Sequence, residues 1–362
     1  MQEILRLVSN VINNKDEKIS ISNELYKIAS FHSLAVFLKP NMDENTTSKE
    51  IIKKVNEDYF LAIKRDTIQL EQLNTLLNLF EENGIDCLPL KGSVIKHLYP
   101  DSFYRIMGDI DILVKEKDFK KARKIIESLN YKSKFNTEHH LEFEKPPFMI
   151  IELHRMLIEK KELGANLFKD IFAKSSLVKN YKHIYQMSKE DFYLFMMCHL
   201  LKHYYLGGTG IRSFLDIYVY LNTYPNLDFN YIDDCLKKTK YYQDAIFIKN
   251  LSLKMFEDKP LDEKENKAIN AIFSYGTYGR SDILAKGELE STNNNANKVI
   301  LKKIFPSVSS MKNLYPILKK CILLLPFTYL VRIFHLLFNF KHSYARSKEL
   351  KKIEKENKKR RK

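Results

Sequence analysis

Glycine and proline together make up only 20 of the 362 residues, which excludes collagen-like and low-complexity chains and disfavours a turn-rich β-sandwich, while the length allows about two domains. The four widely spaced cysteines (Cys87, Cys198, Cys235, Cys321) form neither a metal motif nor a disulfide framework, as expected of a reduced, cytoplasmic chain. The formal charge is +15, and +8 of it lies in residues 341–362, so most of the basic character belongs to a tail.

The first segment, residues 1–83, is predicted to be a helical lead-in. Its apolar residues recur at steps of three and four with charges between them, which is the helical period. This pattern predicts helices over residues 3–12, 19–38 and 48–83, the last one ended by Gly84. The N-terminus lacks the apolar core of a signal peptide, which also favours the cytoplasm.

Residues 84–158 are predicted to form a small core of alternating strands and helices. Short apolar runs alternate here with helical stretches, a pattern typical of mixed α and β structure. The expected strands are 85–90, 110–114 and 149–153, and the expected helices are 93–99 and 116–129.

Three acidic residues in this core are candidate metal ligands. Asp109 and Asp111 are two apart in a predicted strand and therefore point to the same face. Carboxylates so close repel one another unless a cation, a proton or a basic partner neutralises them, and a divalent metal ion is the natural candidate. Glu152 is a lone acid in a later apolar run, and it would complete a three-carboxylate site if the two strands are adjacent.

A candidate phosphate site precedes these acids. Gly92 and Ser93 follow a short strand and open a helix, where backbone N–H groups favour an anion, although the spacing of a Walker loop is absent. Lys91 and Arg105 are local cations that could neutralise triphosphate charge. The alternative is that Lys91 is merely exposed and that Arg105 pairs with a nearby aspartate, Asp101 or Asp109.

Taken together, Gly92-Ser93, Asp109-x-Asp111 and the strand around Glu152 resemble the nucleotidyltransferase superfamily of the DNA polymerase beta type. The strings LKGSVIKHLYP, RIMGDIDILV, KARKIIESLNY and IIELH are more closely similar to a family of uncharacterised bacterial nucleotidyltransferase-like proteins, often encoded with surface-polysaccharide genes. The resemblance extends over about residues 51–335. It implies a mixed sheet flanked by helices, two divalent ions, Mg²⁺ or Mn²⁺, on Asp109, Asp111 and Glu152, and a nucleotide contact at Gly92 and Ser93.

Several polar residues near or after this core are possible substrate contacts. His154 shares the face of Glu152 if both lie on one strand, where it could orient the site, contact substrate or be structural. Residues 159–289 are predicted to be a helical domain, clearest over 191–205 and 211–221. Its helices place two pairs at steps of four: His199 with His203, and Arg212 with Asp216. Each pair could contact nucleotide or acceptor, or form a buried structural network. The two histidines could alternatively bind a metal ion, although no third ligand is evident in the sequence.

The end of the chain is predicted to contain a linker, apolar helices and a basic tail, at 290–298, 299–340 and 341–362. The most apolar stretch, 321–340, is interrupted by polar residues, so it is expected to be a docked core helix or a membrane-surface helix rather than a membrane span. A helix there would gather its polar residues on one stripe: Thr328, Arg332, His335 and Asn339. The tail is interpreted as a solvated segment, or as a weak contact for nucleic acid or anionic lipid.

The sequence therefore predicts an α+β enzyme with a small mixed-sheet nucleotidyltransferase core and a predominantly helical C-terminal domain. The predicted reaction is metal-dependent transfer of a nucleoside monophosphate from an NTP, ATP or another, to an acceptor hydroxyl or phosphate. The acceptor is left open between a small molecule of surface-polysaccharide metabolism, a protein and nucleic acid. The alternative is an inactive nucleotide-binding or RNA- or membrane-binding module. The expected location is the cytoplasm, at the membrane periphery if the tail contacts lipid.

Overall fold

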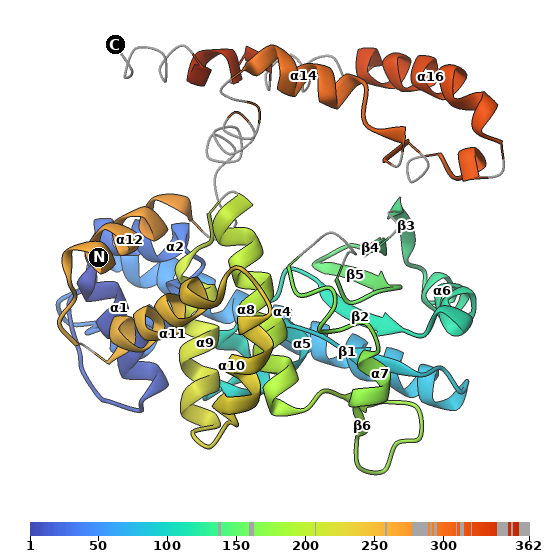
Figure 1. Cartoon of the computed structure of the whole chain (residues 1–362). Coiled ribbons are helices and arrows are strands. Elements are labelled where there is room, and N and C mark those ends of the chain that lie inside the picture. Colours follow the sequence, from blue (N-terminus) through green and yellow to red (C-terminus); the bar gives the residue numbers. More distant parts are fainter. Residues whose placement is uncertain are drawn as a thin grey trace. The chain divides into compact units, whose positions relative to one another are not determined.

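The computed structural model of the chain forms two compact units (Figure 1). The first comprises Met1–Lys202 and Thr209–Thr277, and the second comprises His203–Gly208 and Tyr278–Lys362. The residues described are 1–136, 139–158, 163–206, 208–257, 259–276, 289, 292, 295–308, 310–311, 315–319, 321–338, 347–348 and 350–354.

The first unit begins with helices, but the helix expected over 19–38 is wrong. Its place is taken by α2 (Asn23–Phe31) and a short turn leading into α3 (Leu38–Asn41). Ser22 caps the start of α2 by accepting a hydrogen bond from Leu25 N–H, and Ser33 adopts a positive φ of 56° that no helix continues. The first predicted helix is present as α1 (Gln2–Ile12).

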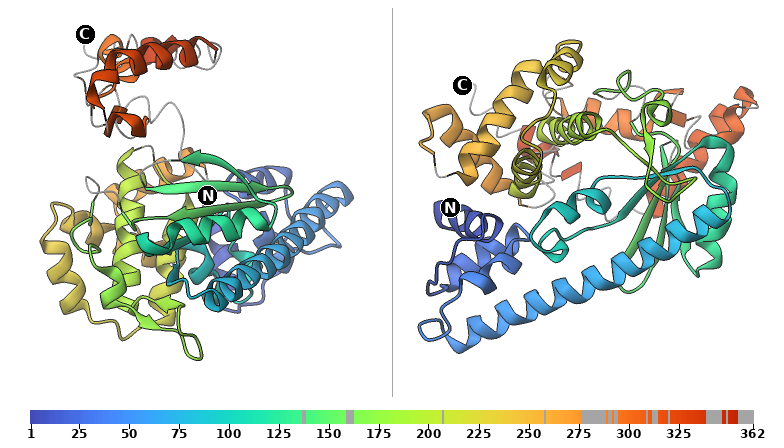
Figure 2. Two further views of the ribbon diagram at one scale, coloured as in Figure 1. Left: turned by 90° about the vertical axis from the view of Figure 1, so that its right-hand side faces the viewer. Right: turned by 90° about the horizontal axis from the view of Figure 1, so that it is seen from below.

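The long helix α4 (Lys49–Glu82) confirms the third predicted helix and runs along the sheet (Figure 2, right). Ser48 caps its N-terminus by accepting a hydrogen bond from Ile51 N–H. Gly84 follows its end with a φ of 64°, a conformation that favours glycine, so the chain turns back toward the sheet there.

A five-stranded mixed sheet follows, in the order β1-β2-β5-β4-β3, which confirms the predicted mixed-sheet α+β class. Strand β2 pairs parallel with β5 and antiparallel with β1, and the other two pairs are antiparallel. The strands are β1 (Cys87–Pro89), β2 (Ile110–Val114), β3 (Lys132–Asn136), β4 (His140–Lys145) and β5 (Met149–His154). Two short helices connect them, α5 (Gly92–Ile95) and α6 (Phe119–Ser128).

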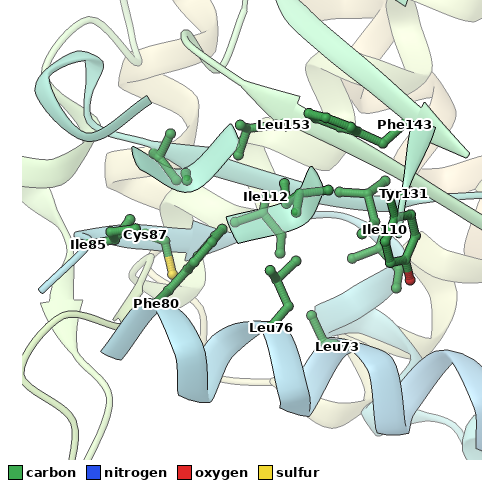
Figure 3. Packing of buried hydrophobic residues seen from close by; sticks show 14 of the residues in the cluster. Leu73, Leu76, Phe80, Ile85, Cys87, Ile110, Ile112, Tyr131, Phe143 and Leu153 are labelled. Carbon is green, nitrogen blue, oxygen red and sulfur yellow. The ribbon is translucent and has the colours of Figure 1, made fainter. Parts of the chain in front are cut away.

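The two faces of this sheet differ in character. One face packs on α4 and α6 in a single hydrophobic core that includes Ile110 and Ile112 of β2, Leu153 of β5, and Leu76 and Phe80 of α4 (Figure 3). Because side chains alternate along a strand, the residues between these apolar ones point to the other face. The acidic residues of β2 and β5 therefore lie on the face away from α4.

Strands β3 and β4 were not predicted from the sequence. The β4 segment alternates polar and apolar residues, and its apolar Leu141 and Phe143 join the core while His140, Glu142 and Glu144 are only partly buried. The helical pattern expected directly after residue 159 is also wrong for the residues described up to 188. They form the short helix α7 (Ile171–Lys174) and a small hairpin of β6 (Ser176–Leu177) and β7 (Tyr185–Gln186).

Five helices complete the first unit, and the two that were clearest in the sequence, α8 and α9, are present. Helix α9 packs on α11, and Asp262 begins α12 with a capping box closed by Glu265. The helices are α8 (Lys189–Leu206, whose last turn belongs to the second unit), α9 (Ile211–Thr223), α10 (Phe229–Lys237), α11 (Tyr242–Phe256) and α12 (Glu263–Tyr275).

The second unit contains α14 (Ala296–Ile304), which begins inside the expected linker, and α16 (Leu325–Phe338). The polar side of α16 faces inward: Thr328 is buried, and the Arg332 guanidinium donates to the carbonyl oxygen of Lys303 at 2.8 Å. Large apolar side chains at helical spacing face outward instead. His335 lies in α16, but its side chain is outside the described part, as is Asn339. Within the described residues, the chain has no helix long and apolar enough to cross a membrane.

Candidate functional site

The parallel pairing of β2 with β5 brings two of the three predicted acids side by side. In this register Asp111 lies opposite Glu152, and Leu113 lies opposite His154. Paired residues on neighbouring strands share a face, so both carboxylates point away from α4. Asp111, Glu152 and His154 each offer a ligand atom within 4.8 Å of the others.

Asp111 is the most deeply buried of the acids and holds two basic partners. Lys91 Nζ donates to its Oδ1 at 2.7 Å, and His154 Nε2 lies 2.8 Å from the same oxygen. Burial by itself raises the pKa of Asp111, but the Lys91 ammonium and His154 outweigh burial and hold the pKa below its usual range. The same contacts raise the pKa of Lys91 and of His154 against the opposing effect of burial.

Asp109 lies directly before β2, and its pKa is shifted in the direction opposite to that of Asp111. Burial and the neighbouring Asp111 and Glu152 carboxylates raise the pKa of Asp109 to about 6, although Lys91 and Arg212 oppose the change. The three predicted acids therefore interact, and at Asp109 burial and the two other carboxylates outweigh the positive charges of Lys91 and Arg212. Asp109 is not part of the closest ligand group, which has His154 in its place.

Strand β4 adds polar residues that the sequence reasoning missed. Glu142 lies opposite Glu152, and His140 lies opposite His154, so both extend the rows of polar side chains from β2 and β5. His140 Nε2 is 3.7 Å from Glu152 Oε1, and buried His139 directly precedes the strand. The His-His dipeptide, followed by one residue and then an acid, was the available signal, because the chain contains only 10 histidines.

Gly92 and Ser93 start α5, next to Lys91. A Cβ on Gly92 would lie 2.9 Å from Met107 Cγ, so a side chain there would displace Met107. The Ser93 hydroxyl is buried and, within the described part of the chain, has no hydrogen-bond partner. A buried hydroxyl without a partner is costly unless a ligand satisfies it.

Arg105 pairs with Asp216 of α9 rather than with a nearby aspartate. Its Nε donates to Asp216 Oδ1 at 2.7 Å, and its second terminal nitrogen donates to Oδ2 at 2.8 Å. The Tyr99 hydroxyl donates to the same carboxylate at 2.7 Å. Arg212 donates to the carbonyl oxygen of Ile106 at 3.0 Å, so α9 is tied twice to the loop before β2. Arg105 and Asp216 thus form a buried bidentate pair that positions this loop.

The two remaining candidates, His199 and His203, lie on α8. His199 is half-buried, with its ring 6.4 Å from that of Phe195. His203 is exposed and belongs to the second unit. Neither histidine is among the groups of potential metal ligands found in the described residues.

A second trio of aspartate, lysine and histidine lies at the other end of β2. Asp86 Oδ2 accepts from Lys115 Nζ at 2.8 Å, and Asp86 Oδ1 lies 2.8 Å from His183 Nδ1. Lys117 Nζ adds a longer contact at 3.6 Å. Burial raises the pKa of Asp86, but its basic partners outweigh burial and lower that pKa on balance. Here one carboxylate meets several basic groups.

Comparison with known proteins identifies the first unit's relatives. A family model described as "Uncharacterised nucleotidyltransferase" matches residues 22–247, a range that contains the sheet and every candidate site residue named above. Among solved structures, the chain is similar to the solution structure of the antibiotic-resistance factor ANT(2'')-Ia, at 12% identity and a TM-score of 0.28, over 58% of this chain and 93% of that chain. No curated protein matches the sequence.

Proposed function

The chain belongs to the uncharacterised nucleotidyltransferase family, as its motifs predicted, and from this premise we propose that it transfers a nucleoside monophosphate from an NTP to an acceptor hydroxyl or phosphate, releasing pyrophosphate. The observation that carries the proposal is the parallel register that sets Asp111 beside Glu152 on one face of the sheet. Asp109 interacts electrostatically with both, which supports a site that uses all three carboxylates.

The donor atoms of this site fit a hard divalent cation. Mg²⁺ and Mn²⁺ prefer oxygen ligands, and three carboxylates against the charges of Lys91 and Arg212, with His154 neutral, leave negative charge to be neutralised. Asp109 and Asp111 would hold two ions, with Glu152 on one of them. When bound, such ions supply neutralising charge to phosphate oxygens. We assign to Glu152 the acceptance of the proton from the acceptor group.

The nucleotide side of the site is proposed at Lys91, Gly92 and Ser93. The Ser93 hydroxyl would donate its free hydrogen to a phosphate oxygen, and this contact would satisfy a buried polar group. Lys91 reaches Asp111 at 2.7 Å and would be shared between that carboxylate and the incoming phosphates. Arg105 holds the loop before β2 through its ion pair with Asp216. The positive charge of Arg212 opposes the rise in the pKa of Asp109.

The test is incubation of the purified chain with each α-labelled NTP, Mg²⁺ or Mn²⁺ and a cell extract. We expect label in one fraction, and that fraction identifies the acceptor as a small molecule, a protein or nucleic acid. The double variant D109N/D111N should abolish the transfer while its circular dichroism spectrum stays unchanged. An inactive binding module, the alternative function, predicts no transfer in any fraction. Transfer by the double variant would contradict the proposed site.

We also propose that the second unit lies against an anionic membrane surface. Three large side chains at steps of three and four on α16 are exposed, Phe327 at 64%, Leu330 at 55% and Phe334 at 61%. A second copy of the chain is a poor occupant of this face because each copy carries +15, whereas anionic lipid complements that charge. Most of the basic tail 341–362 lies outside the described residues, and it would add to the same attraction.

Sedimentation with vesicles tests this surface. The chain should bind vesicles containing phosphatidylglycerol and not neutral ones, and F327S/F334S should weaken the binding. The matched control is F60S, because Phe60 is similarly exposed, at 63%, but lies on α4 of the first unit. Equal binding by both variants would exclude α16 as the contact. Binding to RNA that falls steeply with salt would favour nucleic acid instead.

A further inference from the structure

Three histidines gather beside the carboxylates, at the point where β4 begins and β5 ends. His140 is the first residue of β4 and lies opposite His154, the last residue of β5. His139 precedes them, and its carbonyl oxygen accepts a hydrogen bond from Arg155 N–H at 2.9 Å, which ties it to the end of β5. The ring centroids are 4.8 to 5.5 Å apart. One ring nitrogen of each histidine lies within 4.8 Å of the others.

The hydrogen bonds of His154 define which of its nitrogens is available. Nε2 lies 2.8 Å from Asp111 Oδ1 and 3.3 Å from Glu152 Oε2, so it carries the proton that these carboxylates accept. In the neutral form of His154, Nδ1 is then left with a lone pair. This nitrogen is buried and, within the described residues, has no hydrogen-bond partner, on a side chain that is only 3% exposed. A histidine that donates from one nitrogen to a carboxylate and offers the other to an ion is typical of metal sites.

The donor chemistry separates this cluster from the carboxylate site. Imidazole nitrogens suit zinc and its neighbours among the transition metals, whereas Mg²⁺ prefers oxygen. Zinc binds histidine at about 2.0–2.1 Å, which puts ligand nitrogens roughly 3.4 Å apart in a tetrahedral site. The three rings therefore need to close by about an ångström, which rotation of the side chains can supply. Glu152 Oε1, 3.7 Å from His140 Nε2, is the nearest candidate for a fourth ligand.

We propose that His139, His140 and His154 bind a zinc-like transition-metal ion next to the carboxylate site, with Glu152 shared between the two. Such an ion would fix the tautomer of His154, so that the proton stays on Nε2 and is donated to Asp111 and Glu152. It would also join the start of β4 to the end of β5. This site shares Glu152 with the proposed transfer site, but its test measures metal binding and does not require turnover.

Metal binding is measured on the tag-free, full-length chain after chelation and dialysis. With excess Mg²⁺ present, the chain should take up one Co²⁺ with the visible bands of a tetrahedral nitrogen-rich site, and Zn²⁺ should displace it one for one. Elemental analysis gives the stoichiometry. If wild type retains neither Co²⁺ nor Zn²⁺ under these conditions, the proposal is overturned.

Variants locate the ion. H139N and H140Q replace each imidazole with a polar amide that binds zinc poorly, and each should remove the Co²⁺ bands and the rise of Tm on adding Zn²⁺. D111N, which removes the negative charge that the His154 Nε2 proton faces, should weaken Zn²⁺ binding by about 10- to 100-fold. H97A is the matched control, because His97 is exposed and outside the cluster, and it should bind as wild type does. Wild-type Co²⁺ bands in both H139N and H140Q would overturn the assignment.

Discussion

The two aspartate, lysine and histidine trios at opposite ends of β2 contain the same residue types at almost the same distances. Asp111 holds Lys91 at 2.7 Å and His154 at 2.8 Å, while Asp86 holds its lysine and histidine both at 2.8 Å. Their surroundings differ in charge. Two further carboxylates, Asp109 and Glu152, surround Asp111, whereas a further lysine contacts Asp86.

This difference shows why hydrogen-bond geometry alone does not identify a functional site. At Asp86 the side chains of Lys115, Lys117 and His183 surround the carboxylate and neutralise its charge. The Asp111 trio satisfies one carboxylate and leaves two others close by with too few cations. The excess of negative charge around Asp111 supports our proposal that a cation binds there.

The largest expected effect that separates the two trios is on turnover. D111N should reduce nucleotidyl transfer by at least about 10²- to 10³-fold, because it removes a fixed charge from the reacting centre. D86N should leave transfer unchanged, since Asp86 lies beyond the far end of β2. Initial rates of label transfer at saturating Mg²⁺ measure both. Equal losses of transfer activity in D111N and D86N would show that the two trios do not differ in function.

The next effect concerns the stability of the metal-free protein at pH 7, where Asp109 and Asp111 should respond in opposite directions. The pKa of Asp109 is raised from 3.8 to about 6. The free energy of folding that this group contributes is therefore fully present below pH 3.8 and is lost as the pH rises through 6. D109N should therefore stabilise the chain at pH 7, by roughly 2–3 kcal/mol.

Asp111 has a lowered pKa, so its contribution is present at neutral pH and is lost as the pH falls. D111N should accordingly destabilise the chain at pH 7 by about 3 kcal/mol, the cost of breaking a buried ion pair. Urea unfolding in a chelating buffer between pH 4 and 8 checks both variants. If D109N is less stable than wild type at pH 7, the three carboxylates do not repel one another as described.

The smallest effects come from the Asp86 trio. D86N should cost about 1–2 kcal/mol of unfolding free energy, because Lys115 and His183 are both one-third exposed and can turn to water when their partner is removed. K117M should change stability by less than about 0.5 kcal/mol, since Lys117 is 69% exposed and its contact with Asp86 is long. Thermal unfolding of the two variants at one pH separates these costs.

The parts of the fold that the sequence revealed are those governed by local pattern. Helix α4 follows from its apolar period and the Ser48 cap, and the strand around Asp111 follows from its apolar run. Strand β4 could not be predicted in this way, because polar residues occupy its alternate positions and the same pattern is typical of an exposed segment.

Local sequence patterns could not predict the contacts of the candidate site between residues that are far apart in the chain. The sequence suggested that Glu152 would join the aspartates only on condition that the two strands are neighbours, and only the sheet order fixes that. Arg105 and Asp216 are 111 residues apart in the chain, so no local periodicity could predict their pairing. The role of β4 in presenting His140 and Glu142 depends on the same sheet order.

The parallel pairing of β2 with β5 also determines when the acidic cluster can assemble during synthesis. The chain between Asp111 and Glu152 must first fold back through α6 and the β3–β4 hairpin, and closing a loop of some 40 residues costs about 3 kcal/mol of chain entropy. On the ribosome, β2 therefore waits with an open edge until β5 has emerged. A product truncated before residue 149 would keep Asp109 and Asp111 on that open edge, a template on which other nascent chains can pair and aggregate.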